Sequence, residues 1–363
     1  MTDVPVGASP PKRVPGAMPT TVVGSYSVPS WLERLKTDFH RDRISGARLD
    51  EVHDVVIKAA VKDQEQVGID IISDGELRRD NEVDYVLEHL GGVELLAPKT
   101  YYYDYYEAVV RSPLPEPGEG EGLGLVEQFR FVDGLSDRPI TVSLAGPFSL
   151  SRRLVNEAYR SESDLVMALA HTLHAEAEAL AAAGATYLQI DEPFLAGYPE
   201  AVDLAVRAVN AVTDGVDVHW AMHVCYGNRY ARPAWEGHYD FLFPAVLDAR
   251  IDELKLEFAR KGYDDLELFS RNASDLQIGV GVIDVKNQQV ETEAVIEARL
   301  TQAVNLLGAE RLAVNPDCGL RNLPGVVARA KLAAMTRATA AVRAEVWGAP
   351  LDDGRPGEAD RGR

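Results

Sequence analysis

The sequence contains little cysteine and comparatively few basic residues. Only 2 of its 363 residues are cysteine, and 37 Lys and Arg stand against 57 Asp and Glu, giving a formal net charge of −20 at pH 7. A surface that binds nucleic acid or an anionic membrane needs clustered Lys and Arg, and no stretch of this chain supplies them. We therefore expect neither partner. Two cysteines without an export signal favour the reducing cytoplasm as the compartment.

Long apolar runs are also absent. No stretch of 18 apolar residues occurs, so the sequence predicts no transmembrane helix. The composition is 46% hydrophobic, which is ample for a buried core. Proline and glycine concentrate at both ends, so we expect a flexible arm over residues 1–18, one domain over 19–347 and a flexible tail over 348–363.

Eight short apolar runs alternate with segments that have helical periodicity. The runs are residues 20–26, 68–76, 139–147, 186–193, 217–225, 253–258, 277–284 and 311–319. Nearly continuous apolar runs are typical of strands buried on both faces of a sheet. Eight such strands alternating with helices predict a (β/α)8 barrel, the TIM barrel fold. A doubly wound open sheet is the alternative, but no GxGxxG or GxxxxGK[ST] motif follows the first run.

The extra length lies between the second and third predicted strands, in residues 77–138. This segment holds a helix-like stretch, DNEVDYVLEHL, an aromatic run, KTYYYDYYEAVV, and an acidic glycine-rich loop, PEPGEGEGLG. The pattern predicts an inserted helix and a β-hairpin. The alternative is a lid over the barrel mouth whose tyrosines contact substrate.

Polar side chains gather where the predicted strands end, which is where barrel enzymes place their chemistry. The residues concerned are Ser25, Asp74, Glu76, Asp191, Glu192, His223, Cys225, Glu257, Asp284, Lys286, Asp317 and Cys318. Some of the acids and serines must cap helices. Capping does not explain the concentration of His, Cys and Lys at these ends, so we expect an active site there.

His223 and Cys225 share one face of a predicted strand, because side-chain direction alternates with a period of two. Cys318 and Glu257 end nearby strands, and one nitrogen, two sulfurs and one oxygen suit tetrahedral zinc. Three alternatives remain: a buried core His beside a small Cys, a disulfide, or a cysteine nucleophile with His223 as base. The last is disfavoured, since a shared strand aims the two side chains side by side.

A zinc centre with two thiolates and a carboxylate is negatively charged and suits thiol activation better than hydrolysis. The other rim residues fit a thiol that is also an amino acid. Glu76 and Asp191 suit an ammonium group, and Ser25 with the backbone after Val23 suits a carboxylate. The alternative for these residues is helix capping.

The sequence resembles the catalytic C-terminal barrel of the cobalamin-independent methionine synthases. The stretches that carry the resemblance are TTVVGSY, SDGELRRD, LAGPFSL, LQIDEP, MHVCYGN, LKLEFAR, IGVGVIDVK and VNPDCGL, in family order. The resemblance implies zinc that activates homocysteine, held by His223, Cys225, Glu257 and Cys318. It also implies contacts to the amino and carboxylate groups of homocysteine from Val23, Ser25, Glu76 and Asp191.

Three departures from that family concern the methyl donor. The chain has no room for the second barrel of the long enzymes, Arg153 stands where they place a tryptophan that stacks on folate, and Lys286 replaces a catalytic histidine. Lys286, helped by Asp284, would protonate a leaving group if burial depressed the lysine pKa. These departures predict a donor other than ordinary methyl-folate, for example a methylated corrinoid protein.

Two rival functions stay open. One is alkylation of a different thiol, such as coenzyme M, by an epoxide or similar electrophile. The other is a non-catalytic, zinc-stabilised binding barrel whose four-ligand site does not respond to thiols.

Overall fold

The structure is a computed structural model that describes residues 17–102, 107–115, 122–272 and 274–348. Its centre is a six-stranded sheet in the order β3-β5-β6-β7-β8-β9, with every neighbouring pair parallel. The strands are β3 (Thr141–Ala145), β5 (Tyr187–Asp191), β6 (His219–Val224), β7 (Glu253–Leu256), β8 (Gln277–Ile283) and β9 (Leu312–Pro316). Nearly all their residues are buried, as expected for strands covered on both faces.

The first two predicted strands close this sheet into a ring. Each is reduced to isolated parallel bridges, which are Thr20–Val314, Thr21–Ile71 and Ile72–Ile140. The Thr21 backbone N–H donates to the Val314 carbonyl at 2.9 Å, and the Thr141 N–H donates to the Ile72 carbonyl at 2.8 Å. Residues 20–21 and 71–72 thus join the edge strands β9 and β3, and the predicted (β/α)8 barrel is confirmed.

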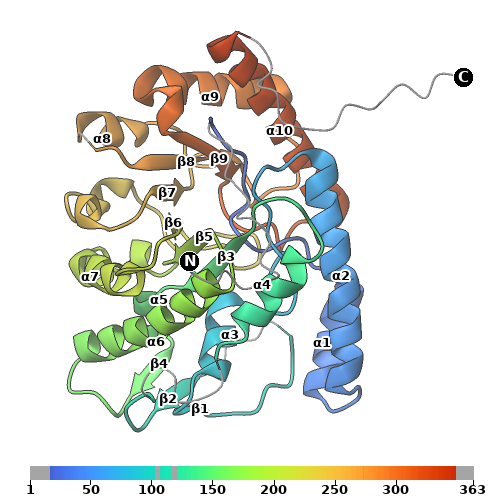
Figure 1. Cartoon of the computed structure of the whole chain (residues 1–363), viewed down its shortest axis with the longest axis vertical. Coiled ribbons are helices and arrows are strands. Elements are labelled where there is room, and N and C mark those ends of the chain that lie inside the picture. The colour runs from blue at the N-terminus through green and yellow to red at the C-terminus, as the bar shows by residue number, and fades with distance from the viewer. Residues whose placement is uncertain (1–16, 103–106, 116–121, 273, 349–363) are drawn as a thin grey trace, which may run out of the picture.

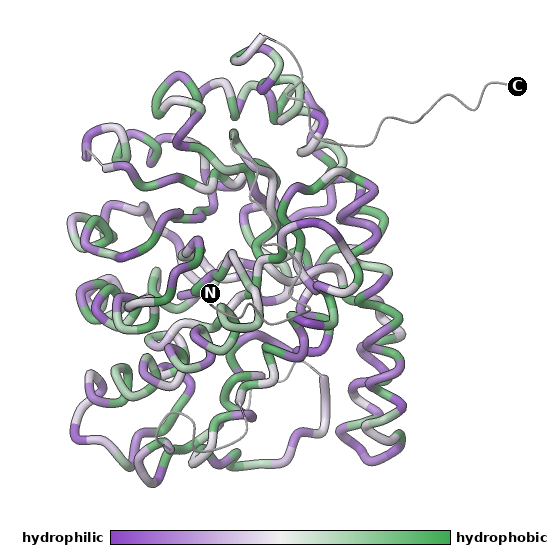
Figure 2. Tube along the Cα trace, in the orientation of Figure 1, coloured by the Kyte–Doolittle hydropathy of each residue, from purple (hydrophilic) through white to green (hydrophobic). Residues whose placement is uncertain are grey.

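Helices surround the strands, with α2 on one side and α6, α7 and α8 on the other (Figure 1). The helices are α1 (Ser30–His40), α2 (Gly46–Val67), α3 (Glu82–His89), α4 (Leu125–Asp133), α5 (Pro147–Ser151), α6 (Glu162–Ala182), α7 (Val202–Thr213), α8 (Leu266–Arg271), α9 (Glu293–Leu307) and α10 (Gly325–Trp347). Short 3-10 turns occur at Leu195–Gly197, Pro199–Ala201, Tyr239–Leu242, Ala245–Asp248 and Ala309–Arg311. Hydrophilic and hydrophobic residues alternate along α2 (Figure 2), as expected for a helix with one face on the core.

The sequence marks the ends of several helices. Ser45, Ser161 and Thr292 cap α2, α6 and α9 by accepting a hydrogen bond from a backbone N–H three residues on. Gly68 ends α2 in the left-handed conformation, φ 91°. Among the described residues, no helix combines the length and the apolarity needed to cross a membrane.

The insertion after the second barrel segment contains the predicted helix, α3, and the predicted hairpin. Strands β1 (Val93–Leu95) and β2 (Ala108–Val110) pair antiparallel, and β4 (Leu154–Asn156) adds a parallel strand to β2. The tyrosine run is only partly described: Tyr102 is buried and Tyr101 is 53% exposed. Residues 103–106 and 116–121 lie outside the described residues, so the lid remains a prediction.

The two predicted flexible ends fall mostly outside the described residues, which begin at Ala17 and end at Gly348. Met18 is buried, and its carbonyl accepts a hydrogen bond from Arg343 at 2.7 Å.

Candidate active site

A cavity of about 290 Å³ opens at the carboxyl ends of the barrel strands, and we call it the active cavity. It brings together eight of the residues predicted from the sequence: Val23, Ser25, Glu76, Arg153, Asp191, His223, Cys225 and Cys318. Three other predicted residues, Glu257, Asp284 and Lys286, are not part of its lining.

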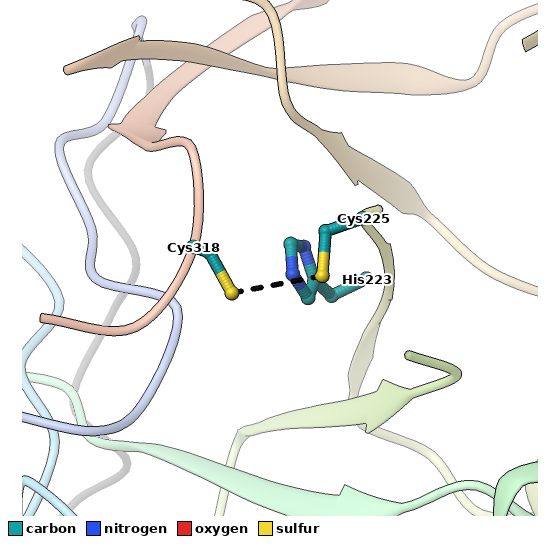
Figure 3. A group of neighbouring side chains, drawn as sticks. All are labelled: His223, Cys225 and Cys318. Atoms are coloured by element: carbon teal, nitrogen blue, oxygen red, sulfur yellow. Dashed lines mark hydrogen bonds between the residues drawn. The ribbon is translucent and has the colours of Figure 1, made fainter. Parts of the chain in front are cut away.

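Three potential metal ligands converge at the base of this cavity. His223 lies near the end of β6 and Cys225 directly after it, while Cys318 lies in the loop that follows β9 (Figure 3). Their ligand atoms lie within 4.8 Å of one another. Both cysteines are free thiols, and their sulfurs are 3.6 Å apart. That distance is far longer than a disulfide bond of about 2.05 Å.

The tautomer of His223 favours metal binding. Its Nδ1 lies 3.2 Å from the Lys255 carbonyl oxygen, which can only accept a hydrogen bond, so Nδ1 carries the proton. The lone pair of the neutral ring is then on Nε2, which is buried and makes no hydrogen bond within the described part of the chain. A metal-binding histidine normally has this arrangement, with its second nitrogen donating to a carbonyl or carboxylate.

The two sulfurs also fit a zinc ion. Two thiolates bound about 2.3 Å from a tetrahedral zinc lie about 3.8 Å apart, close to the distance here. The hydrogen-bonding contact with Cys225, together with burial, raises the pKa of the Cys318 thiol well above its usual value. The pair therefore needs a cation to exist as two thiolates. Geometry and electrostatics both fit the predicted metal.

Glu257, the fourth predicted ligand, lies just after β7 and is held by two cations. Its Oε1 accepts from Arg260 Nε at 2.5 Å, and its Oε2 accepts from Lys286 Nζ at 2.7 Å. Asp317 shapes this loop by accepting hydrogen bonds from the backbone N–H groups of residues 258, 259 and 260, at 2.9, 2.8 and 2.9 Å. Glu257 therefore belongs to an ion-pair network, and it is not among the residues whose ligand atoms lie within 4.8 Å of one another.

Lys286 does not have the depressed pKa that a proton donor would use. Burial of the ammonium lowers its pKa, but the nearby Cys318, Glu257 and Cys225 more than offset this, and the net shift is upward. The sequence-based condition for general-acid catalysis is thus not met. Asp284 accepts a hydrogen bond from the Lys286 backbone N–H at 2.8 Å, so its carboxylate stabilises the turn after β8.

Two buried carboxylates also line the active cavity, Asp191 at the end of β5, where it pairs with His223 of β6, and Glu76 after the second barrel segment. Burial raises the pKa of Asp191 to about 7, and it also raises the pKa of Glu76. Gln189 donates to Asp191 Oδ1 at 2.7 Å, and Arg79 lies 3.6 Å from Glu76. An ammonium group in the cavity would favour the ionised form of both acids.

Close packing on this side depends on two glycines. Gly24 has φ +140°, and a Cβ there would lie 2.4 Å from Glu76 Oε1. A Cβ on Gly319 would lie 2.0 Å from Ser25 Oγ. No larger residue fits at either position without displacing a predicted substrate contact.

The structure adds aromatic and cationic residues that sequence reasoning missed. Phe194 and Trp235 line the active cavity with ring centroids 5.7 Å apart. Trp235 packs on Gly197, where a Cβ would lie 2.2 Å from the indole ring. Other lining residues not predicted are Glu82, Val83, Pro193, Gly227, Asn228, Arg229, Ala234, Gly319, Arg321 and Asn322. Some of these lie in or beside motifs already quoted: Pro193 ends LQIDEP and Phe194 follows it, Gly227 and Asn228 end MHVCYGN, and Gly319 lies in VNPDCGL.

A family model described as "Cobalamin-independent synthase, Catalytic domain" matches residues 18–341. The chain belongs to the cobalamin-independent methionine synthase family. One similar family member, a methionine synthase from Sulfurisphaera tokodaii, is 33% identical over 334 residues, covering 91% of this chain and 94% of that protein. Another, from Saccharolobus solfataricus, is 32% identical with 91% and 96% coverage.

Solved structures of the family give the same fold. A B12-independent methionine synthase from Shewanella sp. W3-18-1, in complex with selenomethionine, superposes with a TM-score of 0.80 at 27% identity, covering 92% of this chain and 99% of that one. A protein from Listeria monocytogenes titled a putative vitamin-B12 independent methionine synthase superposes with a TM-score of 0.70 at 22% identity, covering 87% and 95%. The match covers at least 94% of each of these four proteins.

Proposed function

We propose that this protein is a zinc-dependent methyltransferase that converts homocysteine to methionine. The observation that carries the proposal is the buried His223 Nε2 beside two free thiols, in a cavity that is also lined by two buried carboxylates, Glu76 and Asp191. Membership of the methionine synthase family supports the same reaction. A reducing compartment such as the cytoplasm keeps both thiols available.

His223, Cys225 and Cys318 would hold the metal. When bound, zinc lowers the pKa of a substrate thiol and keeps the thiolate nucleophilic near neutral pH. Glu257 is the proposed fourth ligand, and Lys286 and Arg260 compete with the metal for its carboxylate. Glu257 would therefore be the most weakly held of the four ligands, which would leave a position for a substrate thiol.

A second set of residues in the cavity would orient the amino acid. Glu76 and Asp191 accept hydrogen bonds from the substrate ammonium, while Ser25 and the backbone after Val23 hold the carboxylate. These contacts would orient the side-chain sulfur of the substrate toward the three metal ligands. Coenzyme M has a sulfonate and no ammonium, so it would leave two buried carboxylates unpaired. The rival alkylation of that thiol is disfavoured for this reason.

The donor side supports a methyl donor other than ordinary methyl-folate, such as a methylated corrinoid protein. Arg153 lines the cavity where folate-dependent members stack a tryptophan, and Arg153 Nη2 lies 3.5 Å from Asp84. The sulfur displaces the donor in line, so that the bond from sulfur to the methyl carbon forms as the bond from the donor to that carbon breaks. We still propose that Lys286 and Asp284 assist departure of the leaving group. Lys286 would do so as a fixed positive charge.

The test is a methyl-transfer assay with purified, zinc-analysed protein. We expect about one zinc per chain and methionine formation from homocysteine with a methylated corrinoid donor. Normal turnover with methyl-folate would refute the donor assignment. Zinc without any transfer to a thiol, from either donor, would favour the non-catalytic barrel. Formation of a thioether from coenzyme M and an epoxide would favour the rival alkylation.

A further inference from the structure

A second cavity, of about 450 Å³, lies against the active cavity. Arg321 and Asn322 line both cavities, and the consecutive residues Arg229 and Tyr230 line one each. The two cavities are therefore neighbours with a common wall at Arg321 and Asn322. We call this second space the arginine cavity because four arginines line it: Arg34, Arg41, Arg43 and Arg321.

The charge of the arginine cavity is opposite to that of the protein. Its four arginines face two acids, Glu33 and Asp38, so the lining carries a net charge of +2 in a chain with a formal charge of −20. A concave, positively charged surface on an acidic protein concentrates anions locally. The lining also includes tyrosines 101, 102 and 230, and the Tyr102 hydroxyl accepts a hydrogen bond from Arg321.

Helix geometry does not account for these arginines. Arg41 and Arg43 follow the C-terminal end of α1, where the helix dipole favours cations. Arg34, in contrast, lies in the N-terminal half of α1, where the dipole gives a cation no benefit. Its side chain makes no hydrogen bond or ion pair within the described ranges of the chain.

Arg34 and Arg41 retain guanidinium N–H donors for a ligand, whereas Arg43 and Arg321 already have partners. Arg41 uses its Nε to donate to the Thr100 carbonyl at 2.9 Å and lies 5.8 Å from the centre of the Tyr101 ring. Its two terminal nitrogens make no hydrogen bond to the described residues. Arg43 is paired with Asp38 at 2.9 Å. Arg321 is anchored from the other side by donating to Tyr102 Oη at 3.0 Å. Guanidinium groups bind carboxylates and phosphates through paired N–H donors.

We propose that the arginine cavity binds an anionic group, a carboxylate or a phosphate, of the methyl donor. The methyl-bearing part of the donor would then enter the active cavity past Arg321 and Asn322. The assignment to the donor rests on the proposed function, whereas the anion site itself does not. Carboxylate and phosphate share the same recognition chemistry, so the experiment separates them.

The test uses the full, zinc-loaded chain and calorimetric titration at low salt with two probes, inorganic pyrophosphate and tricarballylate. The variant is the double substitution Arg34→Gln and Arg41→Gln. The matched control is Arg48→Gln with Arg271→Gln, which removes two charges from exposed arginines outside both cavities. Circular dichroism and zinc content check that both double variants fold.

We expect saturable binding of at least one probe, weakened at least about tenfold in the cavity variant and unchanged in the control. Preference for pyrophosphate assigns a phosphate, and preference for tricarballylate assigns carboxylates. No saturable binding of either probe, or equal weakening in both double variants, would overturn the anion site. If the protein binds a probe but shows no methyl transfer, the anion site is supported and the proposed function is refuted.

The donor assignment has its own readout in the methyl-transfer assay. The cavity variant should raise the donor KM at least about fivefold and leave the homocysteine KM within about twofold of the parent. An unchanged donor KM, or an equal rise in both KM values, would overturn the assignment to the donor.

Discussion

The two walls of the active cavity are built differently. His223 belongs to β6, a strand paired on both sides with β5 and β7, and Cys225 follows it directly. Val23, Ser25 and Glu76 come from the first two barrel segments, which join the ring only through isolated bridges. His223 therefore rests on regular sheet, whereas Val23, Ser25 and Glu76 rest on loops. We call His223, Cys225 and Cys318 the metal wall and Val23, Ser25 and Glu76 the loop wall.

The loop wall gains its order from close contacts instead of from a hydrogen-bonded ladder. Ser73 Oγ donates to the Gly24 carbonyl at 2.6 Å and accepts from the Gly75 N–H at 3.1 Å, which ties the two segments together. Gly24 then allows Glu76 to approach the backbone closely. We infer that damage to the metal wall abolishes the reaction, whereas damage to the loop wall weakens substrate binding alone.

The largest expected effect comes from removing a thiol. Cys318→Ser replaces a thiolate with a poor zinc ligand, so we expect zinc content to fall to a small fraction of one ion per chain and methionine formation to fall about a thousandfold or more. Metal analysis and the transfer assay measure both. Full zinc content in Cys318→Ser would contradict the ligand assignment.

Neutralising the two carboxylates that face the substrate ammonium, Glu76 in the loop wall and Asp191 at the end of β5, should have a smaller effect of a different kind. Asp191→Asn and Glu76→Gln each remove a charged acceptor for the substrate ammonium, and a hydrogen bond to a charged group contributes about 1.5–3 kcal/mol. The homocysteine KM should rise about tenfold to a hundredfold, with zinc content unchanged. Loss of zinc in either variant would show that the two walls are not separable.

A single methyl group at Gly24 tests the loop wall without changing any charge. In Gly24→Ala the new Cβ meets the Glu76 carboxylate, so we expect the homocysteine KM to rise by about tenfold. Gly184→Ala is the matched control, since Gly184 also has a positive φ, +105°, but a Cβ there meets nothing within 4 Å. Equal KM changes in both variants would mean that backbone strain, and not the contact with Glu76, is responsible.

The smallest expected effect is a pH dependence of product binding. An ammonium pairs only with ionised Asp191, and burial raises the pKa of this carboxyl to about 7. The affinity for methionine should therefore increase about tenfold from pH 6 to pH 8, because methionine has no thiol to titrate and keeps its ammonium. Titration calorimetry measures this profile, and Asp191→Asn should flatten it. The same slope in Asp191→Asn would exclude Asp191 as its source.

Sequence patterns predicted the barrel and eight of the residues that line the active cavity, because both depend on short-range signals. Apolar runs mark strands, and polar residues directly after them lie at one rim. The patterns did not reveal that residues 20–26 and 68–76 form only isolated bridges, since their composition matches that of the regular strands. Hydrogen-bond pairing depends on how the whole ring closes.

The sequence patterns also failed to predict electrostatic interactions between residues far apart in the chain. The burial of Lys286 was foreseen, but its pKa is set by Glu257 and two cysteines from other parts of the chain. Trp235 lies on a loop, and the arginine cavity combines α1 with segments far away in the sequence, so no local motif marks either of them.

The most direct test of the account is X-ray absorption at the zinc edge, recorded with and without homocysteine. We expect a first shell with two sulfurs, from Cys225 and Cys318, that gains a third sulfur when homocysteine is added. An unchanged first shell at saturating homocysteine would contradict the central claim that this site activates a substrate thiol.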